Sequence, residues 1–470
     1  MTICHMHQAT HHLGAANPYA LSSILQASDH SPIVASEDIC DERGTKLWAR
    51  DQPVSAALQQ RLLDRKLRQP LEACLRAPEG VSSADLVQTV RRTFDETGPL
   101  SLALRPWARE LVGEVERLPL HPVAQLMLTA MRGSQPAAFD HAIQAMLLAG
   151  AMYMHAGSDR YELRLALLAG LLHDVGELYV NPALLAADAE LTPAGFRHIV
   201  VHPRIGELLL ARLTDHPREL ARAVGEHHER GTGMGYPLRA RYLSWLGCRL
   251  SAVETLMGVL ADHATAAHPH HGAAWEHGSL ALRLVPGEFD PVAIAFASQV
   301  ARRVRSHAGL AAPAATAALD GAAVWERSQQ LSRHIEASTQ AAQSLSACTP
   351  PGRVRESATL AAELLAQLAH AGRELGLWAR RELLGEQLGE LDIANREIAH
   401  RVQDIQRIST WLDPDMHADE EAALARLWGP HASAEAHANT SAAWPLAAPA
   451  EACPPLPDPV VASEAAQAAA

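Results

Sequence analysis

Between Phe139 and about Arg303, apolar residues recur at helical spacing in a succession of segments. Glycine, proline and asparagine separate these segments, and alternation of β-branched residues is scarce. At one break, Thr192 followed by Pro193 has the form of an N-cap with proline at the first helical position. The pattern predicts an all-α unit over residues 135–310.

The N-terminal residues show a different pattern. Residues 1–30 are polar and rich in histidine, without periodicity, and we expect a disordered arm there. The segments Ile33–Ala35 and Thr45–Trp48 flank a polar turn sequence, Asp-Glu-Arg-Gly at 41–44, which predicts a short β-hairpin. Helical patterns fill most of the following chain, so residues 31–134 are predicted to form a mostly helical domain that begins with this hairpin.

The C-terminal part is predicted to hold long helices over residues 322–415. In the last of them, apolar positions follow at alternating steps of four and three, and Asn395 occupies an a position of that heptad register. The pattern fits a coiled coil that joins two copies into a homodimer through residues 380–415, and it fits equally a helix packed inside a bundle. The heptad positions are Leu384, Leu388, Leu391, Asn395, Ile398, Val402, Ile405, Ser409 and Leu412.

Residues 430–470 are rich in alanine and proline and contain too few large apolar residues to form a folded structure, so we expect a disordered tail.

Composition narrows the class of protein. With 470 residues, 48% hydrophobic and 20% charged, the chain has the makeup of a globular protein of two or three folded units. Arginine and lysine number 40 against 53 acidic residues, and the formal charge of −13 argues against a nucleic acid polymer as partner. Lys46 and Lys66 are the only lysines, so an anionic substrate of the 135–310 unit must be held by metal or arginine.

The cysteines and the apolar runs indicate the cellular compartment of the protein. The six cysteines are scattered without a CxxC pair, which favours a reducing compartment. The N-terminus lacks the basic and apolar regions of a signal peptide, and the longest apolar runs are too short to span a bilayer. We therefore expect a cytoplasmic protein without a membrane segment.

The strongest chemical feature is the pair His173-Asp174 at the end of the apolar stretch 168–172. An imidazole and a carboxylate are ligands of different hardness, and the two oxygens of Asp174 could bridge two metals. A buried His-Asp pair can equally be a structural hydrogen bond, so the pair alone does not decide between the two.

Further histidines surround this pair in sequence. His141 begins the preceding helical segment, His202 lies in a VVHPRIG segment, and His227-His228-Glu229 stand just before Gly-Thr-Gly-Met-Gly-Tyr-Pro at 231–237. In this order and spacing the sequence resembles the HD-GYP family, whose pattern is a leading His, then HDxGK, HxxxG and HHExxDGxGYP. The resemblance covers about 170 residues, and the Gly-Glu-Phe-Asp-Pro segment at 287–291 looks like the family's closing stretch.

The resemblance implies a bacterial signalling protein with an HD-type helical bundle and a metal-dependent phosphodiesterase activity on cyclic di-GMP. Neighbouring histidines point about 100° apart on a helix, which favours at least two metals. For this ligand mixture, iron or manganese is expected, with zinc as an alternative. The metals would lower the pKa of a water and neutralise charge on a phosphodiester, with Asp174 as the bridging catalytic residue. The implied ligands are His141, His173, Asp174, His202, His227 and His228.

The sequence departs from the family where substrate phosphate is held. Glu177 stands in place of the HDxGK lysine, so Arg204 or Arg230 would have to substitute for it. In the loop, Thr232 replaces the aspartate and Met234 a small residue, while Gly235, Tyr236 and Pro237 are retained. Gly235 and Tyr236 are candidate substrate contacts.

The last metal ligand expected from the family has no identical counterpart. Glu254 falls at its place and is our candidate, and Asp262 is the poorer alternative. Ala137 stands where a three-metal site would want glutamate, so we expect two metals at most.

Two functions compete on this evidence. The first is a phosphohydrolase that uses a two-metal-activated water, with cyclic di-GMP or another phosphate ester as substrate. The second is a catalytically impaired signalling or scaffold protein that binds metal, nucleotide or a protein partner. The nearly complete set of metal ligands favours the first, and the loss of most of the phosphate-holding residues favours the second.

Overall fold

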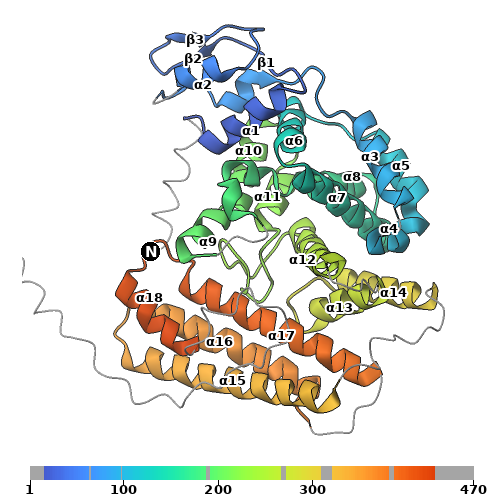
Figure 1. Cartoon of the computed structure of the whole chain (residues 1–470), viewed down its shortest axis with the longest axis vertical. Coiled ribbons are helices and arrows are strands. Elements are labelled where there is room, and N and C mark those ends of the chain that lie inside the picture. Colours follow the sequence, from blue (N-terminus) through green and yellow to red (C-terminus); the bar gives the residue numbers. More distant parts are fainter. Residues whose placement is uncertain are drawn as a thin grey trace, which may run out of the picture. The chain divides into compact units, whose positions relative to one another are not determined.

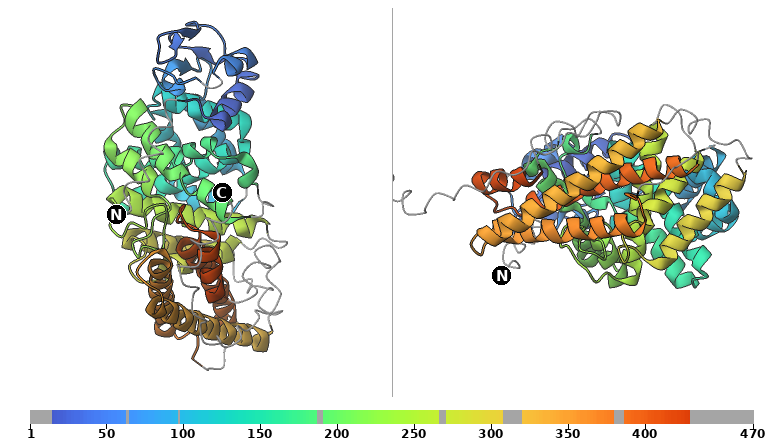
Figure 2. Two further views of the ribbon diagram at one scale, coloured as in Figure 1. Left: turned by 90° about the vertical axis from the view of Figure 1, so that its left-hand side faces the viewer. Right: turned by 90° about the horizontal axis from the view of Figure 1, so that it is seen from below.

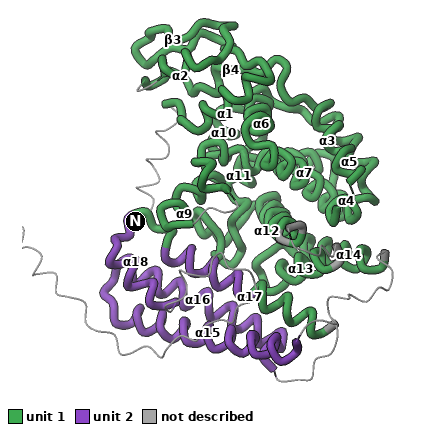
Figure 3. Tube along the Cα trace, in the orientation of Figure 1, with its two compact units in different colours: residues 1–319, 385–397, 411–414 green, residues 320–384, 398–410, 415–470 purple. Residues whose placement is uncertain are grey.

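The computed structural model describes residues 15–62, 65–96, 98–186, 191–265, 271–307, 320–379 and 386–428. The described chain is mainly helical and has very few strand residues, which confirms the all-α prediction (Figure 1). It divides into two compact units (Figure 3). Unit 1 comprises residues 1–319, 385–397 and 411–414, and unit 2 comprises residues 320–384, 398–410 and 415–470.

Unit 1 begins with a helix in the segment that we expected to be a disordered arm. Helix α1 (Pro18–Ser28) starts at Asn17, whose side-chain oxygen accepts hydrogen bonds from the backbone N–H groups of Tyr19 and Ala20. Asn17 at the N-cap and Pro18 at the first turn are strong helix-start signals, so the prediction was wrong for residues 17–28. The remaining N-terminal residues, 1–14, lie outside the described part of the chain.

The small β-structure after α1 differs from the predicted hairpin. Strand β2 (Ile39–Cys40) pairs with β3 (Lys46–Trp48), whereas β1 (Val34–Ala35) pairs with the distant strand β4 (Leu75–Arg76). The turn is fixed by Asp41, whose Oδ1 accepts the backbone N–H groups of Arg43 and Thr45, so the strand directly before it forms the hairpin. Helix α2 (Ala56–Leu62) and the 3₁₀-helix η3 (Leu71–Cys74) complete this N-terminal module, residues 15–76.

A helical bundle forms the rest of unit 1. Helix α7 (Pro136–Ala156) is buried almost continuously from Ala142 to Tyr153, as expected of a central helix that is apolar on all sides. Helix α8 (Arg160–Leu172) packs closely against it, because a Cβ at Gly170 would lie 2.6 Å from the carbonyl oxygen of Ala145. The other elements are α3 (Ser83–Asp95), α4 (Pro99–Leu104), η4 (Arg105–Trp107), α5 (Ala108–Glu116), α6 (Pro122–Ser134), η5 (Val175–Tyr179), η6 (Pro182–Leu184), α9 (Pro193–Ile199), α10 (His202–Leu213), α11 (Arg218–Glu226), α12 (Trp245–Thr265), α13 (His271–Arg283) and α14 (Pro291–His307).

Unit 2 is built on two long helices, α15 (Gly321–Cys348) and α16 (Arg353–Glu374), which lie side by side (Figures 1 and 2). The break between them falls at Thr349–Gly352, where the sequence Thr-Pro-Pro-Gly cannot continue a helix. The short helix α18 (Ala418–Ala425) packs on α16, and the 3₁₀-helix η8 (Arg426–Trp428) follows it.

Helix α17 (Glu386–Thr410) carries the predicted heptad register and contributes residues to both units. Its described a and d positions from Leu388 to Ser409 are buried within the single chain, and Asn395 is fully buried. Burial inside one chain is what the bundle interpretation expects, so the homodimer through residues 380–415 stays a prediction. Leu384 and the tail at 430–470 lie outside the described residues.

None of the helices described here has the length and apolar character needed to cross a membrane.

Candidate metal centre

Side chains from five helices or their ends meet around Asp174. His173 and Asp174 directly follow α8, and His202 is the first residue of α10. His227 and His228 follow α11. His141 lies near the start of α7 and Glu254 lies in α12. All the side chains that the sequence analysis singled out as metal ligands therefore come together in unit 1.

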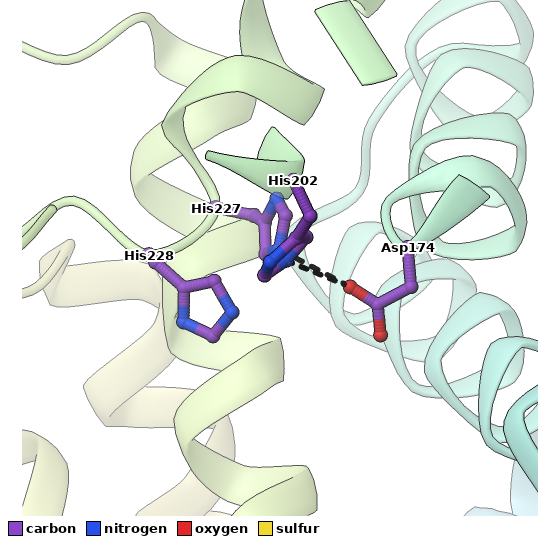
Figure 4. A group of neighbouring side chains, drawn as sticks. All are labelled: Asp174, His202, His227 and His228. Carbon is purple, nitrogen blue, oxygen red and sulfur yellow. Dashed lines mark hydrogen bonds and ion pairs between the residues drawn. The ribbon is translucent and has the colours of Figure 1, made fainter. Parts of the chain in front are cut away.

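The first group of ligand atoms consists of Asp174, His202, His227 and His228 (Figure 4). The Nε2 atoms of His202 and His227 lie 3.0 Å apart, and each lies 3.3 Å from Oδ1 of Asp174. The ring of His228 lies next to that of His227 and is tilted against it by 46°, with centroids 4.3 Å apart. Asp174, His202 and His227 are buried, so the group is shielded from bulk water.

The second group consists of His141, His173, Asp174 and Glu254. The Nε2 atoms of His141 and His173 lie 3.2 Å apart. Oδ2 of Asp174 lies 2.9 Å from Nε2 of His173 and 3.6 Å from that of His141, and Oε2 of Glu254 lies 3.3 Å and 3.5 Å from the same two atoms. Asp174 thus belongs to both groups, with one oxygen directed to each.

Three of the rings are oriented by backbone carbonyl groups. Nδ1 of His173 lies 2.9 Å from the carbonyl oxygen of Gly170, and Nδ1 of His202 lies 2.9 Å from that of Ile199. Nδ1 of His227 lies 2.6 Å from the carbonyl oxygen of Val224. Because a carbonyl oxygen can only accept, each Nδ1 must carry its proton. In the neutral rings Nε2 then presents a lone pair to the centre, as a metal ligand requires.

This donor set fits a pair of cations. Two lone pairs that face each other at 3.0 Å, as in His202 and His227, repel unless a proton or a cation lies between them. Ligand atoms at right angles around a metal with bonds of about 2.1 Å are about 3 Å apart, which matches the observed separations. Among the described residues no hydrogen-bond donor is aligned with Oδ1 of Asp174 or Oε2 of Glu254, although both atoms are buried. A cation in each group would satisfy these oxygens.

The charges of the site favour the same conclusion. Burial would raise the pKa of the Asp174 carboxyl, but the charge of His173 holds it well below its usual range. Burial lowers the pKa of His227, and burial together with His227 lowers that of His228 well below its ordinary value. Burial alone would lower the pKa of His173, but the carboxylate of Asp174 raises it well above its ordinary value. The carboxylate of Asp174 thus favours positive charge in the centre.

The loop at 231–237 lies against the end of α11. Tyr236 stacks on His228, with ring centroids 4.5 Å apart, and its backbone N–H donates to the carbonyl oxygen of His228. A Cβ at Gly235 would lie 2.4 Å from Cα of Glu229, so the close approach of this loop requires glycine. The structure thus places Tyr236 beside the metal centre and gives Gly235 a part in positioning it.

The two arginines proposed as phosphate contacts already bind protein groups. The guanidinium of Arg204 is paired with the carboxylate of Glu207. That of Arg230 donates to Oγ1 of Thr255 at 2.9 Å and lies over the ring of Phe289. A substrate phosphate would have to compete with these partners.

Glu177, at the position of the family's lysine, lies close enough to Asp174 and His202 for their charges to act on it. Burial and the negative charge of Asp174 raise the pKa of Glu177 to about 7. The group that replaces the lysine is therefore a carboxyl at the edge of the metal centre.

Sequence reasoning missed the part played by Glu229. Its carboxylate is buried and accepts the backbone N–H groups of Leu238 and Ala240, at 2.6 Å and 2.8 Å. Glu229 thereby ties the loop after Tyr236 to the end of α11. The sequence His227-His228-Glu229 draws attention to this glutamate, but it does not show whether its side chain faces a histidine, solvent or a loop.

Comparison with known proteins agrees with this geometry. Residues 138–252 match the HD domain family, so the chain contains an HD domain, and its metal-dependent chemistry accords with the two ligand groups. No solved structure matches the chain.

Two curated relatives share part of the sequence. A cyclic di-GMP phosphodiesterase of Pseudomonas aeruginosa is 30% identical over 189 residues, which are 39% of this chain and 44% of the relative. The 3'3'-cGAMP-specific phosphodiesterase 3 of Vibrio cholerae is 40% identical over 80 residues, 17% of this chain and 16% of the relative. The matched region thus spans less than half of either relative. Together with the HD domain, these similarities support a metal-dependent phosphohydrolase.

Proposed function

We propose that this protein is a metal-dependent phosphodiesterase of the HD-GYP type that hydrolyses a cyclic dinucleotide, with cyclic di-GMP as the first candidate. The observation that carries the proposal is the pair of ligand groups that share Asp174. A carboxylate with one oxygen in each group is what a two-metal hydrolytic site requires.

The residues divide between two metal positions. His202, His227 and His228 would hold one cation, His141, His173 and Glu254 the other, and Asp174 would bridge them. Nitrogen and carboxylate ligands without a thiolate suit iron or manganese, with zinc as an alternative. When bound, such a pair supplies a water of lowered pKa and positive charge for the phosphodiester. The protein's own part is to keep Asp174 ionised, to hold the rings in the ligating tautomer and to shield the centre from bulk water.

The substrate class rests on the resemblance and on the printed activities of both relatives, which are cyclic dinucleotide phosphodiesterases. Tyr236 next to His228 offers an aromatic face beside the metals, suited to a nucleobase or ribose. Arg204 could turn from Glu207 to a phosphate, since its side chain is about one-third exposed. We place the activity in the cytoplasm, which the scattered cysteines favour.

The test compares two aspartate variants. The full chain, purified without oxygen and loaded with Fe²⁺ or Mn²⁺, should contain about two equivalents of metal and convert cyclic di-GMP to a linear product. Asp174→Asn keeps the shape of the side chain but removes its charge, and we expect on the order of a hundredfold loss of turnover or more. Asp140→Asn is the matched control, because Asp140 is exposed and faces Arg92 on the outside of α7. Wild-type protein with two metals but no turnover of any cyclic dinucleotide would contradict the phosphodiesterase.

A second candidate, an HD-GYP-like signalling protein that binds without turnover, is favoured by Glu177. A carboxyl at the edge of the centre repels a substrate phosphate where a lysine would attract it. This candidate predicts binding of metal and cyclic di-GMP in calorimetry, with no product after prolonged incubation. Turnover of a different phosphate ester would instead identify a phosphohydrolase with another substrate.

A further inference from the structure

The segment that follows Asp174 lies between the metal centre and the N-terminal module. Helix η5 begins one residue after Asp174, and the backbone N–H of Glu177 donates to the carbonyl oxygen of Asp174 at 2.9 Å. A displacement of η5 is therefore a displacement of the bridging ligand.

On one side the backbone of η5 lies directly against the backbone of His202, another ligand of the first metal group. A Cβ at Gly176 would lie 2.0 Å from the carbonyl oxygen of His202 and 3.0 Å from the backbone nitrogen of Gly206. At Gly176 no side chain separates η5 from the start of α10, so a shift of η5 acts directly on the backbone of His202.

At its other end η5 is held by the N-terminal module. The hydroxyl of Tyr179, the last residue of η5, donates to the carboxylate of Glu72 in η3. Tyr179 is 7% and Glu72 4% exposed, so this bond is buried. The side-chain N–H of Asn17, the N-cap of α1, donates to the carbonyl oxygen of Tyr179 at 3.3 Å. Asn17, at the start of α1, and Glu72, in η3, therefore both bind Tyr179. Each lies more than 100 positions from Tyr179 in sequence.

A second contact reaches the helix before His202. The ring of Tyr19, in α1, lies edge-on to that of His198, with centroids 5.9 Å apart. Nε2 of His198 in turn accepts the backbone N–H of Asn181 at 3.1 Å. The next residue, Ile199, supplies the carbonyl that orients His202. The module therefore contacts the backbone segments next to two ligands of the first metal group, Asp174 and His202.

We propose that Tyr179 and Glu72 are positioning residues through which the N-terminal module holds the metal centre in its ligating geometry. The proposal rests on the metal-binding part of the proposed function and does not require turnover. Ligand positions have to be kept within roughly 0.5 Å, and a loosened η5 shifts Asp174 relative to the other ligands. A change in the module, through a ligand or a partner protein, would reach the centre by the same route.

The experiment measures Mn²⁺ binding to the chelator-stripped full chain by calorimetry, beside thermal unfolding in EDTA. Tyr179→Phe and Glu72→Ala should each raise the Kd for Mn²⁺ about tenfold or more. The double variant should be no worse than either single one, because both remove the same bond. Glu72→Gln keeps an oxygen that accepts from the tyrosine hydroxyl and should recover most of the affinity.

Tyr153→Phe is the matched control. Tyr153 is 1% exposed in α7 and has no contact with the N-terminal module among the interactions described, so the same substitution there should leave the Mn²⁺ Kd unchanged. The proposal is overturned if Tyr179→Phe and Glu72→Ala lower the unfolding temperature while the Kd for Mn²⁺ stays that of the wild type. A wild-type protein that binds Mn²⁺ but hydrolyses nothing would sink the phosphodiesterase and leave this test intact.

Discussion

Gly176→Ala is the most direct test of how tightly the two ligand-bearing segments are packed. The added methyl group would lie 2.0 Å from the carbonyl oxygen of His202 and 2.8 Å from its carbonyl carbon. Both obstacles are backbone atoms, so no side-chain rotation relieves the overlap, and the two segments must separate by on the order of 1 Å. Overpacking of this kind costs about 1–3 kcal/mol of stability. Since the shift also exceeds the roughly 0.5 Å tolerated by a preorganised site, we expect about 10- to 100-fold weaker metal binding.

The assay is a Mn²⁺ titration of the chelator-stripped chain, paired with thermal unfolding in EDTA. Gly258→Ala is the control, because Gly258 is exposed on α12 and its Cβ would meet no atom within 4 Å. There alanine should leave metal binding unchanged and stabilise the helix by about 0.5–1 kcal/mol. If Gly176→Ala folds and binds Mn²⁺ as tightly as the wild type, the contact between η5 and α10 is not what fixes the geometry of the centre.

Three further predictions concern other parts of the chain. Glu229→Gln leaves one of the N–H groups of Leu238 and Ala240 without an acceptor, so a loss of about 1–3 kcal/mol in denaturant unfolding is expected, and unchanged stability would contradict the anchoring role. Burial lowers the pKa of His334 from its ordinary value near 6.5 to about 4, so stability is full above pH 6.5 and falls as the pH drops toward 4. Between pH 7.5 and 5 this loss is about 2 kcal/mol, and His334→Phe should abolish it in urea titrations at the two pH values. Light scattering of the intact chain tests the homodimer through residues 380–415, since a mass near 50.6 kDa would contradict it.

The metal centre could be predicted from the sequence because most of its candidate ligands lie at helix ends, where sequence signals are strongest. His173 and His227 each follow an apolar-periodic helix, and His202 stands directly before Pro203 at a helix start. The resemblance of their order and spacing to the HD-GYP pattern grouped them into one ligand set. Glu254 was harder, because a glutamate inside a helix has no local signal, and its place was inferred only by its offset from the other ligands.

Other features were beyond sequence reasoning because they depend on distant partners. The pairing of β1 with β4 joins residues about 40 positions apart. A strand of two residues is too short to show the alternating pattern from which a strand is predicted. The bond between Tyr179 and Glu72 spans 107 positions and looks in sequence like an ordinary tyrosine and an ordinary surface glutamate. Helix α1 is different, since Asn17-Pro18 was a readable start signal that the polar, histidine-rich context obscured.

The backbone carbonyl groups of Ile199 and Val224, which face Nδ1 of His202 and His227, affect which sequence changes the metal centre can tolerate. Main-chain oxygens set the tautomer of the rings, so the side chains at these two positions take no part in that task. A substitution at either position changes the local packing, but the carbonyl oxygen that holds the proton on Nδ1 of the ring remains.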